Sequence, residues 1–489
     1  MGPILNSYPD SLGGQLKDVV ELLNREECKD VFSGYYILPS LYHSDLDRGF
    51  SVQDYGLEQS LATEKDLENL KKLGIKLKLD FILNHCSVLS PQFQDLIKNG
   101  EKSPYKDFFI NWNEFWDGYG VMNEDGVIIP DDKYLSLMFF RKPGLPLLQV
   151  EFPDGRLVPY WNTFYSEVKE ENGKKSYLGQ MDVNIQSPLV WDFYDQTLQQ
   201  LANYGASIVR LDAFAYAPKE VGKPNFLNEP ETWDTLQKVS DLADQYHLQL
   251  LPEIHASYSE KKYEIIGQKG YLVYDFFLPG LLIYSIMSKD PTYLYQWASE
   301  IVDKGLKTIN MLGCHDGIPV LDLKGLLPEE KIQETMDFIV GNGGYVKNLD
   351  GKKNMYYQVN ATYFSALGED EKALEFARAV QMFMPGTPQV WYLDVFAGKN
   401  NTEALKYGHK EINRTNLSWD DIEQGLHKEV VLRQLLLLKL RNTHPIFQGD
   451  YTLEITKEDN SLVFMYLNGE HSLSLIANFE DCTYSIINE

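Results

Sequence analysis

Cysteine is scarce in this sequence, and what there is lies far apart. The 489 residues include four cysteines, with no CxxC pair among them: Cys28, Cys86, Cys314 and Cys482. So scattered a set excludes a dense disulfide framework, and we expect free thiols in a reducing compartment. No Asp-rich loop of the calcium-binding kind stands out either, so we expect no metal and no other cofactor.

Long apolar runs and basic residues are also in short supply. No apolar run approaches the ~20 residues of a membrane span. The first residues, MGPILNSYPDS, carry no basic leader and no long apolar core, so we expect no signal peptide and a cytoplasmic protein. The 45 Lys and Arg against 71 Asp and Glu give a net charge of −26. This charge disfavours nucleic acid and anionic membranes as partners. The expected partners are small molecules, and the protein is expected to be a monomer or a homodimer.

Strand-like and helix-like segments alternate along most of the chain. Repeated strand-then-helix units predict a parallel sheet with helical crossovers, and eight strands predict a closed (β/α)8 TIM barrel of the α/β class. The eight strand-like runs are residues 3–8, 33–40, 76–85, 206–214, 248–255, 271–278, 307–316 and 387–393.

Two stretches interrupt this alternation, and the tail departs from it. Residues 86–180, rich in Trp, Gly, Pro and Asp, are expected to form an irregular lobe after the third strand. Residues 318–357 are expected to form a second insertion after the seventh strand. Long loops in a compact chain are usually functional. Short alternating runs predict a small all-β domain over residues 446–489. The barrel is then expected in three parts, residues 1–85, 181–317 and 358–445.

Three of the strand-like runs lead directly into a carboxylate. These acids are Asp212, Glu253 and Asp316, and a fourth run leads to Asn84 and His85. Parallel barrels gather catalytic groups from the C-terminal ends of several strands, so these side chains are expected at one rim. Two carboxylates in one pocket suit glycosidic-bond chemistry, which needs a nucleophile and a proton donor. Any one of these acids, taken singly, is more often a structural ion-pair partner than a catalytic group.

Taken together and in order, these motifs resemble the α-amylase superfamily. Other segments, including DRGFSVQDY, MFFRKPGLP, MPGTPQVWY and INRT, resemble the sucrose phosphorylase group within it, and the resemblance covers nearly the whole chain. The four superfamily motifs are matched by Asn84-His85, Arg210 with Asp212, Glu253 with His255, and His315-Asp316.

The resemblance implies a role for each matched residue. Asp212 would be the nucleophile, Glu253 the general acid/base, and Asp316 the carboxylate that holds the glucosyl ring. Arg210 would orient Asp212 and lower the pKa of that nucleophile, while apolar neighbours and nearby carboxylates would raise the pKa of Glu253. The other residues implied to bind the substrate are Asp47, Phe50, His85, Tyr216, His255, His315, Gln358 and Arg414.

The acceptor side departs from the group's pattern. One loop normally reads leucine–aspartate–any–tyrosine–glutamine, and here Met355 replaces the aspartate while Tyr357 is kept. The other loop carries Arg141 beside Lys142, an arrangement similar to that of members acting on sucrose 6′-phosphate. Thr415 replaces the histidine of the usual INRH. Roles in binding phosphate or the acceptor are therefore expected for Arg141, Lys142, Tyr357 and Met355.

The resemblance thus implies a retaining glucoside phosphorylase. A β-glucosyl ester on Asp212 would be resolved by inorganic phosphate to give α-D-glucose 1-phosphate, with sucrose or sucrose 6′-phosphate as the substrate. Glucosylglycerol or glucosylglycerate phosphorolysis remains open, as does an α-glucoside hydrolase or transglucosidase. A non-catalytic sugar-binding protein is the alternative outside enzymes, and the intact Asp212 and Glu253 argue against it.

Overall fold

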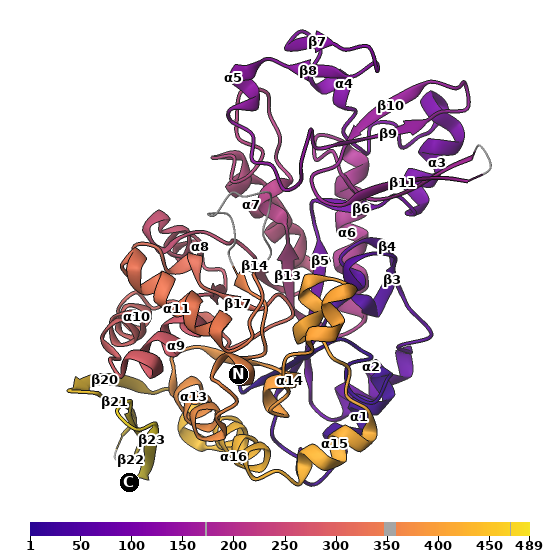
Figure 1. The fold of residues 1–489 in the computed structure, drawn as a ribbon. Coiled ribbons are helices and arrows are strands. Elements are labelled where there is room, and N and C mark those ends of the chain that lie inside the picture. The colour runs from indigo at the N-terminus through magenta and orange to yellow at the C-terminus, as the bar shows by residue number, and fades with distance from the viewer. Residues whose placement is uncertain (172–173, 347–357, 470) are drawn as a thin grey trace. The chain divides into compact units, whose positions relative to one another are not determined.

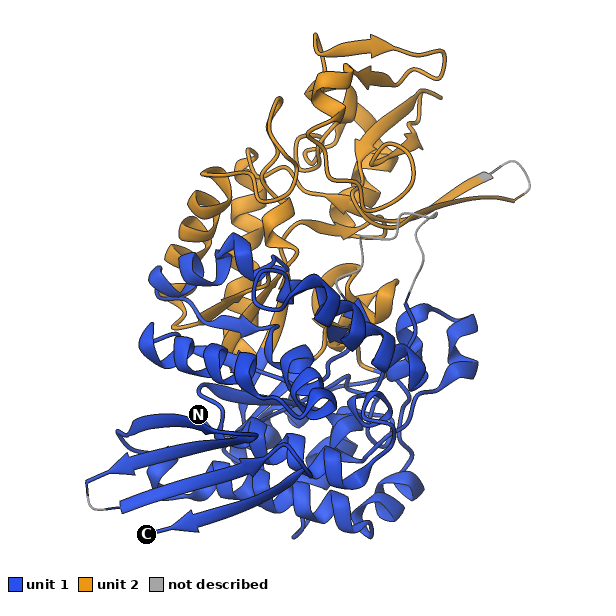
Figure 2. Ribbon diagram, turned by 60° about the vertical axis from the view of Figure 1, so that its left-hand side comes forward, with its two compact units in different colours: residues 1–37, 60–78, 254–489 blue, residues 38–59, 79–253 orange. Residues whose placement is uncertain are grey.

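The computed structural model describes residues 1–171, 174–346, 358–469 and 471–489 (Figure 1). The chain divides into two compact units (Figure 2). Unit 1 comprises residues 1–37, 60–78 and 254–489, and unit 2 comprises residues 38–59 and 79–253.

Parallel strands form the central sheet of the chain. In the described ranges eight strands contribute to it, in the order β14-β13-β5-β2-β1-β19-β16-β15. Their residues are mostly buried, because side chains fill the interior of a parallel barrel and helices cover its outside. The prediction of a (β/α)8 barrel is confirmed, since each strand falls within one of the eight predicted runs. The strands are β1 (Ile4–Ser7), β2 (Gly34–Ile37), β5 (Lys76–Ile82), β13 (Ala206–Asp212), β14 (Gln249–Pro252), β15 (Val273–Asp275), β16 (Thr308–Asn310) and β19 (Thr387–Trp391).

Helices lie in the stretches between the strands of unit 1. The second of them begins at a capping box, in which the backbone N–H of Thr63 donates to Asp66 Oδ2 at 2.9 Å. The helices are α1 (Leu16–Asn24), α2 (Glu64–Lys72), α8 (Lys262–Gln268), α9 (Leu278–Ser288), α10 (Thr292–Asp303), α11 (Glu329–Gly341), α13 (Glu371–Phe383) and α16 (Glu429–Thr443).

The C-terminal part of unit 1 is the small all-β domain that the alternating pattern predicts. Its strands pair antiparallel in chain order, and Leu462, Phe464 and Tyr466 of one strand are buried on the same face. This period of two is what a sheet with one covered face requires. The strands are β20 (Thr452–Glu458), β21 (Ser461–Asn468), β22 (His471–Asn478) and β23 (Thr483–Asn488).

Unit 2 holds strands β13 and β14, the end of β5, and an irregular lobe. The lobe has its own aromatic core around Trp112, Trp116 and Trp161. Its last strand, β12 (Lys174–Asp182), pairs antiparallel with β6 (His85–Ser87), which directly follows β5. None of the helices in the described ranges has both the length and the apolar character needed to cross a membrane.

Candidate functional site

Unit 2 brings together the predicted nucleophile, the predicted general acid and the arginine between them. Arg210 and Asp212 are two residues apart on β13, so their side chains leave the same face of the strand. Glu253 directly follows β14, and its backbone N–H donates to Leu211 O at 3.2 Å, which holds it beside the end of β13. Pairing of adjacent parallel strands thus places both acids at one edge of the sheet.

One guanidinium contacts both of these acids and a further one. Arg210 Nη1 lies 2.8 Å from Asp212 Oδ1 and 2.6 Å from Asp80 Oδ1, and Nη2 lies 2.5 Å from Glu253 Oε1. Asp80 is fully buried, whereas the side chains of Asp212 and Glu253 are each 13% exposed. The arginine therefore leaves the two predicted catalytic carboxylates accessible while it fixes their position.

The contact between Arg210 and Glu253 is an addition to what the sequence predicts. The apolar neighbours and carboxylates near Glu253 were expected to raise its pKa, and that expectation stays a prediction. The structure adds a guanidinium in contact with the same carboxylate. The contact with Asp80 was also missed, although an acid directly before the apolar end of a predicted strand is a usable signal.

Three rings, those of His85, Phe164 and Tyr216, form an aromatic wall in unit 2 that includes two of the predicted sugar-binding residues. The ring of Phe164 lies 5.1 Å from the rings of both His85 and Tyr216, measured between centroids. His85 Nε2–H donates to Phe50 O at 2.9 Å, and burial lowers the pKa of His85, which keeps the imidazole neutral. Asp47 is exposed, three residues before Phe50 in the same segment. Phe164 itself went unrecognised in the sequence.

The two neighbouring cations of the predicted acceptor loop have different environments. The Lys142 ammonium donates to Asn162 Oδ1 and, at 3.0 Å, to Ser166 Oγ, and burial lowers the pKa of Lys142 to about 8. Arg141 is exposed, and its guanidinium carbon lies 5.8 Å from the centroid of the Phe164 ring. Arg141 therefore lies on the aromatic wall, whereas Lys142 is engaged within the protein.

A buried ion pair contacts the segments that carry two of the wall's residues, His85 and Tyr216. Lys219 Nζ lies 2.7 Å from Asp182 Oδ2 and also donates to Asn84 Oδ1 at 3.1 Å and to Tyr216 O at 2.7 Å. Thr163 Oγ1 donates to the same Asp182 oxygen at 2.6 Å. The ammonium thus fixes the residue before His85 and the backbone of Tyr216.

Removing this ammonium should destabilise the protein strongly. The Lys219→Met variant leaves Asp182 buried without its cation, so the free energy of unfolding should fall by about 3–5 kcal/mol. Urea unfolding at pH 7 measures it. The matched control is Lys223→Met, because that lysine is 38% exposed and its ion pairs with Glu220 and Glu231 span 4.0 and 3.5 Å. Exposed pairs of this kind contribute about 0–1 kcal/mol, so equal losses in the two variants would contradict the prediction.

Unit 1 contains the third predicted carboxylate, Asp316, in a strongly cationic setting. Its carboxylate lies 3.2 Å from His315 Nε2, 2.6 Å from Lys410 Nζ and 3.8 Å from Arg414 Nη2. Burial alone would raise the pKa of Asp316, but these cationic neighbours outweigh it and hold the pKa well below its usual range. Arg414 Nε also donates to His315 O at 2.8 Å, which joins the two predicted motifs. Lys410 was missed, although it lies two residues before INRT.

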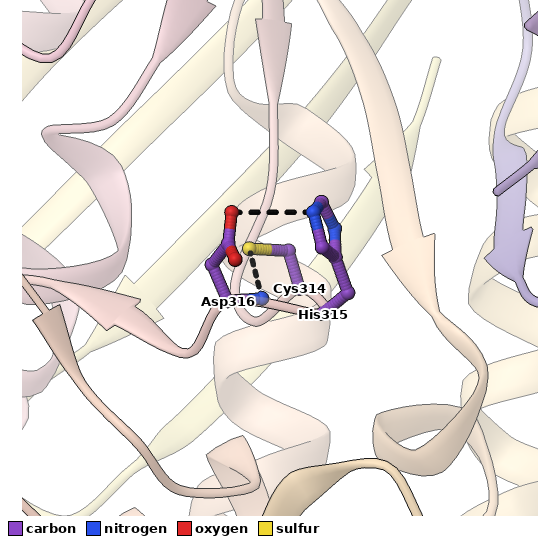
Figure 3. A group of neighbouring side chains, drawn as sticks. All are labelled: Cys314, His315 and Asp316. Atoms are coloured by element: carbon purple, nitrogen blue, oxygen red, sulfur yellow. Dashed lines mark hydrogen bonds and ion pairs between the residues drawn. The ribbon is translucent and has the colours of Figure 1, made fainter. Parts of the chain in front are cut away.

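The same segment contains a cluster of groups that could ligate a metal (Figure 3). One ligand atom from each of Cys314, His315 and Asp316 lies within 4.8 Å of the others, and the Asp316 N–H also donates to Cys314 Sγ at 3.4 Å. Lys410 and Arg414 already compensate the Asp316 charge and would repel a further cation. The residues present therefore suit an ionised carboxylate that accepts hydrogen bonds better than they suit a metal.

The remaining predicted residues divide between described and undescribed parts of the chain. His255 Nδ1 lies 3.3 Å from Asp322 Oδ1, and Gln358 Nε2 lies 3.4 Å from His255 Nε2, both within unit 1. Asp322 was not recognised in the sequence. Met355 and Tyr357 lie outside the described residues.

Comparison with known proteins adds the family. Residues 31–276 match the family described as alpha amylase, catalytic domain. The chain is 51% identical, over 99% of its own length and 95% of the relative's, to the sucrose 6(F)-phosphate phosphorylase of Ilumatobacter coccineus. It is 35% identical, over 99% and 98% of the two lengths, to the sucrose phosphorylase of Streptococcus mutans.

A solved structure agrees with these relatives. The crystal structure of sucrose 6F-phosphate phosphorylase from Thermoanaerobacter thermosaccharolyticum is similar with a TM-score of 0.89 and 33% identity, covering 100% of this chain and 95% of that one. The barrel and its strand-end carboxylates define the class as that of the α-amylase-type barrels. The chain belongs to the alpha-amylase family and, within it, to the sucrose phosphorylase group that includes the sucrose 6(F)-phosphate phosphorylases.

Proposed function

We propose that this protein is a retaining phosphorylase that acts on sucrose 6(F)-phosphate, releasing α-D-glucose 1-phosphate and fructose 6-phosphate. The observation that carries the reaction type is the Arg210 guanidinium, which contacts both Asp212 and Glu253 at the ends of adjacent strands. Retention needs two carboxyl groups ~5–5.5 Å apart, one as nucleophile and one as acid/base.

In the proposed mechanism, Asp212 attacks the anomeric carbon while Glu253 gives its proton to the departing glycosidic oxygen. The bond between glucose and the acceptor breaks as the ester to Asp212 forms. Phosphate then attacks the same carbon and gives a proton to Glu253, and Asp212 leaves as the carboxylate. Asp316, which its cationic neighbours hold ionised, is proposed to accept hydrogen bonds from glucose hydroxyls.

The choice of a phosphorylated acceptor rests on Arg141 and on the relatives. The protein has a net charge of −26, yet it presents an exposed guanidinium over the aromatic wall, where an anion would otherwise be repelled. Arginine binds phosphate through paired, charge-assisted hydrogen bonds. Two of the relatives named above act on sucrose 6(F)-phosphate by name. Unphosphorylated sucrose is the second candidate, by likeness to the sucrose phosphorylase of Streptococcus mutans.

An acceptor panel tests the proposed function directly. The protein is incubated with α-D-glucose 1-phosphate and, in turn, fructose 6-phosphate, fructose, glycerol or glycerate, and the release of inorganic phosphate is measured. We expect the fastest release with fructose 6-phosphate. Preference for fructose would make it a sucrose phosphorylase, preference for glycerol or glycerate would reassign the acceptor, and glucose release with water alone would indicate a hydrolase.

The two neighbouring cations should differ in their effect on acceptor choice. Charge-assisted hydrogen bonds contribute about 1.5–3 kcal/mol each, and about 1.4 kcal/mol is tenfold in affinity. The Arg141→Ala variant should therefore raise KM for fructose 6-phosphate roughly 10- to 100-fold, with a much smaller change for fructose. Steady-state synthesis rates with each acceptor measure this ratio.

Lys142→Ala is the matched control for that experiment. Its ammonium is engaged by Asn162 and Ser166, so its loss should leave the ratio of the two KM values unchanged. If Arg141→Ala weakens both acceptors alike, or if Lys142→Ala shifts the ratio more, the assignment of Arg141 to an anionic acceptor is wrong.

A further inference from the structure

His255 in unit 1 is held on three sides by side chains from different segments. Its ring stacks on Phe276, with centroids 4.1 Å apart and planes inclined by 26°. Its Nδ1 faces Asp322 Oδ1 at 3.3 Å, and its Nε2 faces the Gln358 amide nitrogen at 3.4 Å. The imidazole is therefore an oriented link between a buried acid and an amide.

The acid and the amide are carried by one small substructure. Asp322 lies in the 3-10 helix η6 (Leu321–Leu323), shortly after strand β17 (Ile318–Pro319). Gln358 begins strand β18 (Gln358–Val359), which pairs antiparallel with β17 so that Pro319 faces Gln358. The relative placement of Asp322 and Gln358 thus follows from strand pairing.

The direction of the hydrogen bonds along this link follows from the amide. The Gln358 NH2 group can only donate, so His255 keeps a lone pair on Nε2 and carries its hydrogen on Nδ1, where it faces Asp322 Oδ1. That lone pair accepts from the Gln358 NH2 group, which turns the Gln358 oxygen away from the imidazole. Gln358 is partly exposed, and within the described part of the chain this oxygen makes no hydrogen bond.

The burial of Asp322 indicates that its role is more than structural stabilisation. Asp322 is 1% exposed, and its Oδ2 is buried with no hydrogen-bond partner among the described residues. Burial raises the pKa of Asp322, and only the contact with His255 among its side-chain partners opposes this shift. A buried carboxylate oxygen without a partner destabilises a fold, so its presence needs another explanation.

We propose that Asp322 is a positioning residue for acceptor recognition: through the tautomer of His255 it fixes the Gln358 amide so that its oxygen is presented to a hydroxyl group of the acceptor sugar. The inference rests on the proposed function for its ligand, an acceptor with donor hydroxyls. The tautomer itself is independent of any activity. Asp322 touches neither substrate nor reacting atoms, and acts only through the two side chains.

The Asp322→Asn variant tests this chain of hydrogen bonds. The asparagine NH2 group would find no acceptor at the position of Oδ2, which has no partner among the described residues, so we expect it to turn toward Nδ1. That orientation drives the hydrogen of His255 to Nε2, which then requires the Gln358 oxygen as its acceptor. The amide turns, and the acceptor hydroxyl meets an NH2 group instead of an oxygen. KM for fructose should rise about tenfold, the size of one lost hydrogen bond, while kcat changes less than about threefold.

A second substitution supplies a rescue that a merely structural role would not predict. Gln358→Glu offers an oxygen in either orientation. Adding it to Asp322→Asn should therefore lower KM for fructose most of the way back to the wild-type value. Fructose is the acceptor of choice here because a carboxylate at position 358 would repel a phosphate ester. A double variant whose KM for fructose is as high as that of Asp322→Asn alone would overturn the proposal. So would an Asp322→Asn variant in which kcat falls by as large a factor as KM rises.

Nitrogen-15 NMR of histidine-labelled protein gives a readout that does not depend on turnover. The His255 signal, assigned by its loss in His255→Gln, should show hydrogen on Nδ1 in the wild type and on Nε2 in Asp322→Asn. A wild-type signal with hydrogen on Nε2 overturns the proposal even if Asp322→Asn fails to fold. Failure of the proposed function would appear separately, as a wild-type protein that releases no phosphate with any sugar acceptor.

Discussion

Glucoside phosphorolysis by the Asp212→Asn variant is expected to fall by about 10⁴-fold or more, because an amide cannot form the glucosyl ester and no other group replaces it. Arg210 keeps its contacts with Asp80 and Glu253 in this variant, so the fold should survive. The measurement is the release of α-D-glucose 1-phosphate from sucrose and from sucrose 6(F)-phosphate in the presence of phosphate.

The matched control for that variant is Asp192→Asn. Asp192 is an exposed acid on helix α6 (Pro188–Asn203) of the same unit. Its replacement by asparagine removes the same negative charge, but not beside Arg210. It should keep full activity, and both variants should unfold within a few degrees of the wild type. Near-normal turnover by a folded Asp212→Asn protein would remove the nucleophile from the mechanism.

The second large effect is expected from Glu253→Gln, and it should depend on the leaving group. A general acid contributes about 10²–10⁴-fold where the departing oxygen needs a proton. Cleavage of a sugar or alkyl glucoside should fall by that factor, whereas α-glucosyl fluoride, whose fluoride leaves with little protonation, should retain far more of its rate. Initial rates with the two substrates, at equal phosphate concentration, give the ratio.

The outcome for Glu253 separates two readings of its contact with Arg210. If both substrates lose activity alike, Glu253 serves to hold the guanidinium, and the proton donor lies elsewhere. If only the substrate with the poor leaving group loses activity, Glu253 is the proton donor, and its contact with Arg210 must break when the proton is transferred. A Glu253→Gln protein that loses neither activity would refute the assignment altogether.

The barrel and its catalytic acids could be predicted from sequence because their signals are local. An apolar run of strand length followed at once by an acid needs no knowledge of the partner strand, and Asp212 and Glu253 each end such a run. Their shared contact with Arg210 could not be predicted this way. It depends on the register of β13 against β14, in which Leu211 pairs with Pro252.

Residues that support the site were harder to find. Phe164 and Lys219 lie in irregular segments, where no period relates a residue to its neighbours. Adjacency in the sequence does not distinguish Arg141 from Lys142, and the fold adds that Lys142 donates to Ser166 while Arg141 is exposed. Both residues lie in a bend before strand β9 (Leu147–Glu151), where no regular period relates the directions of neighbouring side chains.

The ion pair between Lys219 and Asp182 also decides where this chain can be recombined with a relative. Asp182 is the last residue of β12 and Lys219 lies beyond β13, so a crossover placed between them transplants one charge without the other. A hybrid that exchanges residues 86–180 keeps both charges from the same parent. A crossover a few residues later keeps the ion pair only where the second parent carries the same two residues. Crossover sites for chimeras should therefore be chosen by this ion pair and not by the edge of the lobe.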